Sequence, residues 1–535
     1  MSKQLSVAAE IRGAILIGAE DATTRDTFRA VDPASGAVLE PAFSAAGPEQ
    51  VEAACAQADA AFPSFSESSP EVRAGFLETV AQAVGNLGDS LIERAMAETG
   101  LPRGRLEGER ARTIGQLRLF ARVVRTGDWV QATIDPAQPK RTPLPRPDLR
   151  RRHVALGPVA VIDASNVPLA FSVVGGDTAS ALAAGCPVIV KGHPAYPGTG
   201  ELVARAVRAA VATSSLHAGV FSYLPGPSNV LGTALVADAR IKAVGFTGSR
   251  GGGLALMRMA VGRPEPIPVY AEMSTVNPVL LLPGALRAPS AALATGFAQS
   301  LTMGPGQFCT TPGLLIGIAG SDLDAFAQAA AAAIRESAPH AMLTTDIPTR
   351  FERGVAEIAA RPGVTMTARG ETAGSGGAPA ALLRTDGARF LADASLTEEM
   401  FGPAAILVAA ADLDEVKRVI ATLPGHLTAT LHLDRADEHI AAGLIPTLSR
   451  KAGRILANGW PTGLEVAPAM VHGGPFPATL DGRSTSVGPL AIERFLRPVC
   501  YQDLPDALLP KPLRPDNPWH LTRRVDGTIS PAFDR

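Results

Sequence analysis

Apolar and polar positions along the chain follow two periods, one typical of helices and one typical of buried strands. Residues 71–100 carry apolar side chains at helical spacing, and this pattern stops at Gly100. A second helical stretch covers residues 106–125. Prolines then interrupt the helical pattern between residues 128 and 158, and their flanks have the composition of strands. The first part of the chain is therefore predicted to be mostly helical, followed by extended segments.

From residue 159 short apolar runs alternate with helical stretches. The predicted strands span residues 159–164, 187–191, 219–224 and 241–249. Strands separated by helices form a parallel sheet with crossover connections, and such a sheet binds its ligand at the carboxyl ends of its strands. A similar alternation over 276–470 predicts a second α/β domain, and residues 486–505 are predicted to contain a strand before a proline-rich tail.

Composition narrows the class of protein. The 535 residues are 46% hydrophobic and 19% charged, which is typical of a globular protein of two or three domains. A net charge of -2 gives no electrostatic reason to bind nucleic acid or an anionic membrane, and no stretch reaches the roughly 18 uncharged apolar residues of a membrane span. The four cysteines are far apart, so we expect no metal site, no disulfide framework and a reducing, cytoplasmic compartment.

One cysteine, Cys309, stands in a turn rather than in an apolar run. Its segment is "MGPGQFCTTPG", where glycine and proline on both sides expose the side chain and bring backbone N–H groups close to it. Cys186 lies instead in "AAGCPVIV", a setting typical of a buried structural cysteine. We therefore interpret Cys309 as a thiol that a substrate can reach.

Two further segments have the pattern of a nucleotide site. The segment "VGFTGSRGGG" joins a strand to a helix through a glycine turn, so that the backbone around Gly248, Ser249 and Gly253 could bind phosphate. A tight connection with no ligand explains the same pattern. The segment "IVKGHP" ends a strand at Lys191 and includes His193. A lysine there could reach a ribose or a phosphate, or could simply be exposed at the end of its strand.

Three more segments hold candidate catalytic groups. Glu272 lies between two apolar strands in "VYAEMSTVNP", where a raised pKa and a role as general base are expected, unless it forms a structural ion pair. Asn166 in "SNVP" could donate to a developing oxyanion or serve as a turn residue. Glu399 and Phe401 in "LTEEMFGP" could contact a cofactor, or could be a solvated carboxylate and a core side chain.

In this order and at these spacings, the segments resemble the aldehyde dehydrogenase superfamily over nearly the whole chain. The resemblance implies that Cys309 is the nucleophile, Glu272 the base and Asn166 the oxyanion donor. It implies that NAD or NADP is held by Lys191, His193, Gly248, Ser249, Gly253, Glu399 and Phe401. The reaction so implied is oxidation of a small-molecule aldehyde to an acid through a thiohemiacetal and a thioester of Cys309.

The same resemblance implies an α/β fold of two Rossmann-like three-layer domains with a β oligomerisation arm. We expect a cofactor domain over 1–275, interrupted by the arm at 128–153, and a catalytic domain over 276–470. Residues 471–535 should return to the cofactor domain. In the family the arm pairs with a strand near the C-terminus, for which "RFLRPVCYQDLP" is the candidate, so we expect a homodimer or a dimer of dimers.

Two segments depart from the commonest family pattern. Ser274, Thr275 and Val276 follow Met273 where two glycines and a lysine are usual, and no glutamate follows Lys191 closely. With "NGWPTGLEV" and "VHGGPFPATLDGRSTSVG" these variants resemble the 2,5-dioxovalerate (α-ketoglutarate semialdehyde) dehydrogenases, some relatives of which prefer fatty aldehydes. A coenzyme-A-acylating enzyme and a non-enzymatic protein on this scaffold are more distant alternatives. Without that glutamate, we expect NADP to be accepted as well as NAD.

The helix over 106–125 holds the candidate substrate-binding residues. Glu109, Arg112 and Gln116 fall at i, i+3 and i+7, on one face. Alignment with the family places Arg112 in the wall of the substrate tunnel, and an arginine fork suits a carboxylate. We expect Arg112, with Gln116 and Phe171, to bind the substrate. The alternative is an ion pair between Arg112 and Glu109 on a solvated face.

Overall fold

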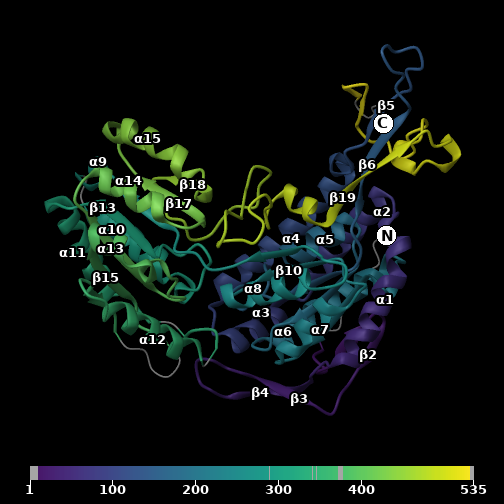
Figure 1. Cartoon of the computed structure of the whole chain (residues 1–535). Coiled ribbons are helices and arrows are strands. Elements are labelled where there is room, and N and C mark those ends of the chain that lie inside the picture. The colour runs from purple at the N-terminus through teal and green to yellow at the C-terminus, as the bar shows by residue number, and fades with distance from the viewer. Residues whose placement is uncertain (1–9, 288–289, 340, 345, 372–376, 531–535) are drawn as a thin grey trace.

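Two seven-stranded sheets form the core of the molecule. The computed structural model describes residues 10–530 apart from 288–289, 340, 345 and 372–376. Figure 1 shows the two sheets in separate lobes, each covered by helices. The α/β class predicted from the sequence is therefore confirmed.

The first sheet has the order β11-β10-β7-β8-β9-β1-β2. Its strands are β1 (Ile15–Ile17), β2 (Glu20–Ala22), β7 (Val159–Ile162), β8 (Val188–Gly192), β9 (Phe221–Pro225), β10 (Ala243–Thr247) and β11 (Val269–Glu272). The five strands from β7 to β11 are parallel, as their alternation with helices predicts. The helices of this lobe are α1 (Pro48–Ser66), α2 (Pro70–Asn86), α3 (Gly88–Thr99), α4 (Arg103–Thr126), α5 (Gly176–Ala184), α6 (Pro197–Thr213), α7 (Asn229–Ala237) and α8 (Arg250–Val261).

The second sheet has the order β14-β15-β16-β13-β12-β17-β18. Its strands are β12 (Pro278–Leu281), β13 (Leu314–Ile318), β14 (Thr365–Arg369), β15 (Ala381–Asp386), β16 (Ala404–Ala410), β17 (His426–His432) and β18 (Ala452–Ala457). Its helices are α9 (Pro283–Arg287), α10 (Ser290–Thr302), α11 (Ser321–Arg335), α12 (Ile347–Ala359), α13 (Gly387–Ala392), α14 (Leu413–Thr422) and α15 (Glu438–Leu448). A separate two-stranded sheet joins β3 (Thr27–Val31) and β4 (Val38–Ser44).

A third sheet extends from the first lobe as an arm (Figure 1). It has the order β19-β6-β5-β20-β21 and contains β5 (Thr133–Asp135), β6 (Leu149–Ala155), β19 (Leu496–Gln502), β20 (Arg523–Val525) and β21 (Thr528–Ser530). The predicted pairing is present, since β19 runs antiparallel to β6 over seven residue pairs from Leu496↔Ala155 to Gln502↔Leu149. Part of the C-terminal tail therefore belongs to the arm.

The predicted single helix over 71–100 is wrong in one respect. The structure has two helices, α2 and α3, which break at Leu87 because Gly88 adopts a left-handed φ of 55°. Ser69 caps the start of α2 through its side chain, and Gly100 ends α3 with a left-handed φ of 66°. The predicted end at Gly100 is thus correct, and Gly88 divides the apolar pattern into two helices.

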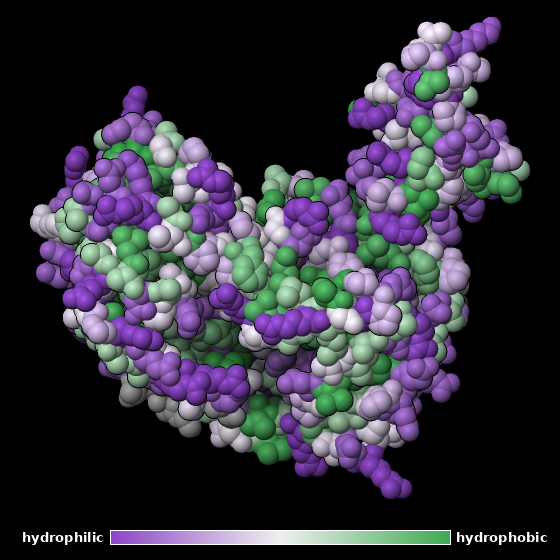
Figure 2. Space-filling view, in the orientation of Figure 1, coloured by the Kyte–Doolittle hydropathy of each residue, from purple (hydrophilic) through white to green (hydrophobic). Residues whose placement is uncertain are grey.

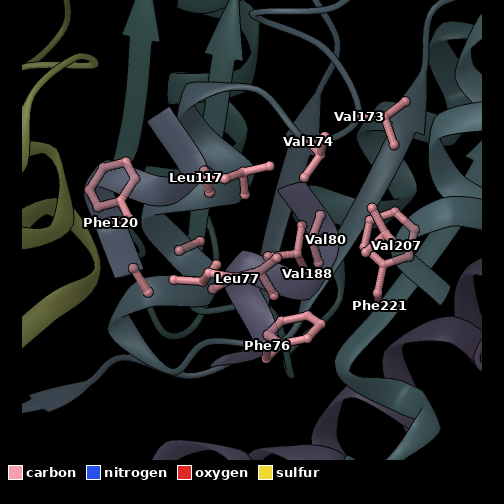
Figure 3. Close-up of a cluster of buried hydrophobic side chains, with 14 of the residues drawn as sticks. Phe76, Leu77, Val80, Leu117, Phe120, Val173, Val174, Val188, Val207 and Phe221 are labelled. Atoms are coloured by element: carbon pink, nitrogen blue, oxygen red, sulfur yellow. The ribbon is translucent and has the colours of Figure 1, made fainter. Parts of the chain in front are cut away.

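The core of the first lobe packs α2, α4 and α6 on one face of the sheet (Figure 3). The buried side chains drawn there include Phe76, Leu77, Val80, Leu117, Phe120, Val188, Val207 and Phe221. Each large apolar side chain buried in this way contributes roughly 1.5–3 kcal/mol. Ala491, Ile492 and Phe495 join the same core from the far end of the chain. The domain limits of 1–275, 276–470 and 471–535 stay a prediction, which this packing supports.

The described helices also bear on membrane association. None of them, within the residues that the structure describes, combines the length and apolar character needed to cross a bilayer. The cellular compartment stays a prediction.

Candidate active site

A cleft of about 380 Å³ lies where the two lobes meet, and Figure 2 shows the surface hollowed there. Strands β7, β10 and β11 end at this cleft, as expected for a ligand site in a parallel sheet. Residues of α12 and of the loop that contains Glu399 form the facing wall. The structure brings to this cleft the predicted site residues Asn166, Gly248, Ser249, Glu272, Cys309, Glu399 and Phe401.

The turn that carries Cys309 is held close to the loop before β16. Gly306 has a φ of 68°, and a side chain there would place its Cβ 2.3 Å from the backbone nitrogen of Pro403. Only glycine allows this approach. Cys309 is half-buried and lines the cleft, so a substrate in the cleft can reach its sulfur.

Three side chains from distant segments meet at the thiol. The Sγ atom of Cys309 lies 3.4 Å from Nε2 of His472, and the same nitrogen lies 3.0 Å from Oε1 of Glu272. Ser486 donates its hydroxyl proton to Oε2 of Glu272 at 3.2 Å. A single imidazole nitrogen therefore faces both the thiol and the carboxylate. It can accept a proton from one and donate it to the other in turn.

The pKa values of this group differ from the sequence-based expectation. Burial alone raises the pKa of Glu272, but the His472 imidazole and the hydrogen bonds to the carboxylate outweigh it and leave that pKa below its usual value. The expected raised pKa of Glu272 is therefore wrong, because the sequence did not reveal His472. Burial and the neighbouring Glu272 carboxylate raise the pKa of the Cys309 thiol. The resting group thus combines a carboxylate with a protonated thiol.

Asn166 is placed to act beside the nucleophile. It is buried, it follows β7, and its Nδ2 donates to the carbonyl of Gln307 at 2.6 Å. This bond fixes the amide against the turn that carries Cys309. One amide N–H is used in this way, which leaves the second for another acceptor.

Asn277 anchors the nucleophile turn from the other side. Its Nδ2 donates to the carbonyls of Cys309 at 2.8 Å and of Thr311 at 3.0 Å. Its Oδ1 accepts from the backbone N–H and the hydroxyl of Thr428, and its backbone has a left-handed φ of 45°. Sequence reasoning missed Asn277, which stands five residues after Glu272 in the quoted segment "AEMSTVNP".

His472 is the other residue that sequence reasoning missed. It lies in "VHGGPFPATL", a segment used only for the resemblance to a family branch. The chain has nine histidines. This one stands directly before two glycines and a proline, so the same argument from turn residues that singled out Cys309 could have found it.

Lys191 and His193 lie at and just beyond the carboxyl end of β8. Lys191 is buried, and its burial lowers its pKa against the opposing effect of Asp163. Burial also lowers the pKa of His193 to about 3, and its ring stacks on Tyr196 at 5.2 Å between centroids. His193 is therefore neutral at physiological pH. Of the two residues, only Lys191 can offer a positive charge to a nucleotide.

The glycine turn before α8 forms a capped helix start at the edge of the cleft. Ser249 is the N-cap, and its hydroxyl accepts from the N–H of Gly252 at 3.2 Å. Gly248 donates its N–H to the carbonyl of Glu272 at 3.0 Å, which joins this turn to the end of β11. Gly253 is buried, and a Cβ there would lie 2.6 Å from Sδ of Met273. Its role in the structure is close packing of α8 on β11.

Glu399 and Phe401 lie on the opposite wall of the cleft. Both are half-buried. Burial raises the pKa of Glu399 to about 7, although the Ser274 hydroxyl and the N–H of Thr275 bind the carboxylate. Burial therefore favours the neutral form of Glu399 relative to an exposed glutamate.

The substrate-binding candidates on α4 lie close to the thiol. The guanidinium carbon of Arg112 is 5.0 Å from the centre of the Phe171 ring, which in turn lies 5.8 Å from the His472 ring. Nε and Nη2 of Arg112 are buried without a hydrogen-bond partner in the described part of the chain, and so is Nε2 of Gln116. Burial lowers the pKa of Arg112, and the nearby Cys309 has the opposite effect.

The alternative for Arg112, an ion pair with Glu109 on a solvated face, is wrong. Glu109 is buried and accepts a 2.6 Å hydrogen bond from Nε of Arg105. Its second oxygen accepts from the backbone N–H of Leu169 at 3.1 Å. The carboxylate is thus already bound by two other donors, and Nε and Nη2 of Arg112 have no hydrogen-bond partner among the described residues.

Comparison with known proteins agrees with this geometry. The chain is 56% identical to alpha-ketoglutaric semialdehyde dehydrogenase 2 of Azospirillum brasilense over 97% of its own length and 99% of that protein. It is 45% identical to the alpha-ketoglutaric semialdehyde dehydrogenase of Acinetobacter baylyi, over 96% of its own length and 97% of that protein.

Solved structures show the same fold at low sequence identity. A 1-pyrroline-5-carboxylate dehydrogenase matches 91% of this chain and 92% of its own, with a TM-score of 0.78 and 21% identity. Aldehyde dehydrogenase C of Pseudomonas syringae, in complex with NAD+ and octanal, matches 93% of this chain and 98% of its own, with a TM-score of 0.77 and 20% identity. The protein-family model described as "Aldehyde dehydrogenase family" matches residues 20–349 of this chain. This chain is a member of the aldehyde dehydrogenase family and is an oxidoreductase.

Proposed function

We propose that this enzyme oxidises α-ketoglutarate semialdehyde (2,5-dioxovalerate) to 2-oxoglutarate, with NAD or NADP and water as co-reactants. The observation that carries this proposal is the free guanidinium of Arg112, buried beside the Cys309 thiol. Leaving a buried cation without an anion is costly, so the group is suited to a substrate that supplies one. The two relatives that are 56% and 45% identical bear the name of this activity.

The chemistry begins at Cys309. His472 takes the thiol proton, and the sulfur attacks the aldehyde carbon. The oxyanion that forms accepts hydrogen bonds from the second amide N–H of Asn166 and from the backbone N–H of Cys309. A nicotinamide held beside Glu399 and Phe401 would supply the hydride acceptor, and loss of hydride from the thiohemiacetal would leave a thioester of Cys309.

Hydrolysis of the thioester then needs a base close to the acyl carbon. Glu272 is a carboxylate held by His472 and Ser486, and it lines the cleft beside Cys309. It can take a proton from a water that attacks the acyl carbon, which releases the acid and restores the thiol. A coenzyme-A-acylating enzyme would need no such base, so Glu272 favours hydrolysis.

The distal carboxylate of the semialdehyde would lie against Arg112. Nε and Nη2 of this residue point from the same edge of the guanidinium, which allows a two-point contact with a carboxylate. Gln116 has a buried, unpartnered Nε2 one turn further along α4 and could donate to the same substrate. Phe171 packs against the guanidinium face and separates it from His472.

The cofactor site fits a dinucleotide of either kind. The N-terminal turn of α8 offers backbone N–H groups to a phosphate, and Lys191 offers a positive charge. No glutamate lies between Lys191 and Gly200 to repel a 2′-phosphate. We expect NADP to be accepted alongside NAD, and titration of both cofactors against the enzyme decides between them. Binding of NAD alone would show that shape, and not charge, governs the pocket.

A second candidate substrate, a fatty or aliphatic aldehyde, has one observation in its favour. An apolar cluster of Ala164, Val167, Ala170, Phe171 and Val487 lies beside the site, with Leu464, Val466 and Met470 packed against it. An alkyl chain could bind along such side chains. This candidate leaves the guanidinium of Arg112 without a partner, so it is the weaker of the two.

A kinetic comparison tests the proposed function. The purified enzyme is given NAD or NADP with α-ketoglutarate semialdehyde, neutral alkanals and other semialdehyde acids, with and without coenzyme A. We expect the highest kcat/KM for α-ketoglutarate semialdehyde and free 2-oxoglutarate as product in both cases. A higher kcat/KM for long alkanals would favour the second candidate. Formation of an acyl-coenzyme-A product would contradict hydrolysis.

We further propose a homodimer, or a dimer of dimers, built through the arm. The arm extends away from the body of the chain (Figure 1), and β19 is an edge strand of its sheet. An exposed strand edge is a surface for pairing with another chain. Sedimentation measures the oligomeric state of the full chain. The same measurement is made on a variant with proline in place of Val499 on β19.

A further inference from the structure

We propose that Cys309, His472 and Glu272 also form an inhibitory zinc site. One donor atom from each of these residues lies within 4.8 Å of the other two, and this is the one such group of His, Cys, Asp and Glu side chains in the described part of the chain. The earlier expectation of no metal site was based on the spacing of the cysteines. That argument did not cover a cysteine that meets a histidine and a glutamate in the fold, where all three come from segments far apart in the sequence.

Two of the three separations between donor atoms are close to those that zinc requires. Tetrahedral Zn²⁺ binds sulfur at about 2.3 Å, nitrogen at about 2.0–2.1 Å and carboxylate oxygen at about 2.0–2.2 Å, which puts neighbouring donors roughly 3.3–3.6 Å apart. The observed separations are 3.4 Å from Sγ to Nε2 and 3.0 Å from Nε2 to Oε1. The third pair, Sγ of Cys309 and the Glu272 carboxylate, lies within 4.8 Å, so it would have to close by up to about 1.2 Å around the ion.

The donor set selects zinc by its chemistry. A thiolate and an imidazole favour zinc over magnesium or calcium, and a carboxylate completes three protein ligands. The thiol proton of Cys309 is released to solvent when the Zn–S bond forms. Cys309 faces the cleft, so a water molecule can fill the fourth position.

The neighbouring bonds hold these ligands in place. Ser486 binds the carboxylate oxygen of Glu272 that does not face His472, and Asn277 binds the backbone carbonyl of Cys309. Hydrogen bonds of this kind orient metal ligands and strengthen binding. The arrangement needed for proton transfer is therefore also an arrangement that can capture zinc.

Zinc at this position would stop the reaction. It would occupy the sulfur that attacks the aldehyde and the carboxylate that activates water, while leaving the turn before α8 open to the cofactor. We expect inhibition that a chelator reverses and that aldehyde opposes. The inference needs only the positions of the three side chains and does not depend on which aldehyde is the natural substrate.

A titration of the full-length, metal-depleted enzyme tests the site. Zn²⁺ is added against a chromophoric chelator while the rate of NAD(P)H formation is followed. We expect one tight zinc per chain, loss of activity in proportion to occupancy, and full recovery with excess chelator. Co²⁺ should give a thiolate charge-transfer band and the visible bands of a tetrahedral ion.

Three variants and one control make the test specific. His472→Gln and Glu272→Gln should each weaken zinc binding, the first by roughly 100-fold or more, and Cys309→Ser should remove the charge-transfer band. Cys500→Ser, which alters an exposed thiol on the arm, should bind zinc as the wild type does. Cofactor titration confirms that each variant is folded. The proposal would be overturned if His472→Gln and Glu272→Gln both bind zinc with unchanged affinity. It would also be overturned if the charge-transfer band persists in Cys309→Ser.

Discussion

Two groups of polar side chains lie close to the Cys309 sulfur and differ in how their hydrogen bonds are satisfied. Cys309, His472 and Glu272 contact one another, and Ser486 binds the remaining carboxylate oxygen. On α4, by contrast, Arg112 and Gln116 have buried N–H groups with no partner among the described residues. The hydrogen bonds of the first group are satisfied without a ligand, and those of the second group are not.

This difference indicates separate roles. Buried polar groups are costly unless they are bonded, so a folded protein keeps them unpaired mainly where a ligand completes them. The partnered group can move protons before any substrate arrives. The unpartnered group gains its stabilisation only when an anion binds. The comparison therefore supports the proposal that the first group carries out the chemistry and the second selects the substrate.

Among changes to the partnered group, removal of the proposed nucleophile should lower the rate of aldehyde oxidation most. Cys309→Ala should lower aldehyde oxidation by roughly 10⁴-fold or more, because no other group can form the thioester. Cofactor affinity, measured by titration of the purified variant, should stay nearly unchanged. Cys186→Ala should affect stability alone, since that thiol is buried in the core of the first lobe. Substantial turnover by Cys309→Ala would remove Cys309 from the mechanism.

Replacing the base should separate the two halves of the reaction. Glu272→Gln keeps the shape of the side chain but cannot take a proton from water, so one rapid turnover of NAD(P)H should be followed by a steady rate lowered roughly 100-fold or more. Stopped-flow absorbance measures both phases. A variant with neither phase would indicate that Glu272 acts earlier, through His472 on the Cys309 thiol. An unchanged steady rate would exclude Glu272 as the base.

Most of the central fold could be predicted from the sequence because its signals are local. The apolar runs of β7, β8 and β10 alternate with helical patterns, and each run gave a strand. Strands β1 to β4 were missed. Of these, β1 and β2 have only three residues each, and β1 also depends on a partner far along the chain. Leu16 of β1, for example, pairs with Tyr223 of β9. The break at Gly88 was also missed, since the apolar pattern continues across it.

The candidate site shows the same limit. Cys309, Glu272 and Asn166 each stand in a short segment with its own pattern, and the structure places all three at one cleft. His472 is 163 residues from Cys309 and 200 residues from Glu272, so no local pattern connects them. The direction of the Glu272 pKa shift was wrong for the same reason. A pKa depends on neighbours in space, and a single sequence does not reveal them.

Giving Arg112 a neutral side chain tests the unpartnered group. Arg112→Met should raise KM for α-ketoglutarate semialdehyde by roughly tenfold or more, a loss of about 1.5–3 kcal/mol for a charged hydrogen bond. Activity on neutral alkanals should hold or improve, because an unpaired buried charge has been removed. Arg118→Met, an exposed arginine on the same helix, is the matched control and should change neither substrate. If Arg112→Met raises KM equally for the semialdehyde acid and for the alkanals, or changes neither, the result would favour the fatty-aldehyde alternative.

Glu399 belongs to neither group, and its ionisation should make folding stability depend on pH. It accepts hydrogen bonds from Ser274 and Thr275, but no ion pair involves it among the described residues, and burial raises its pKa from 4.5 to about 7. Between these values the unfolded chain releases the proton while the folded chain keeps it. Folding stability attributable to Glu399 is therefore full below pH 4.5 and is lost as the pH rises toward 7.

Glu399→Gln mimics the neutral form at every pH, so its advantage over the wild type should grow as the pH rises. We expect nearly equal thermal midpoints at pH 5 and a more stable variant at pH 8, by at most about 2 kcal/mol because the residue is half-buried. Cofactor affinity should respond in the opposite direction. A carboxylate that binds ribose hydroxyls must be ionised, so the wild type should bind NAD(P) more weakly below pH 7 while Glu399→Gln binds weakly throughout. A wild-type affinity that does not change between pH 6 and pH 8 would show that Glu399 contacts the cofactor without depending on its charge.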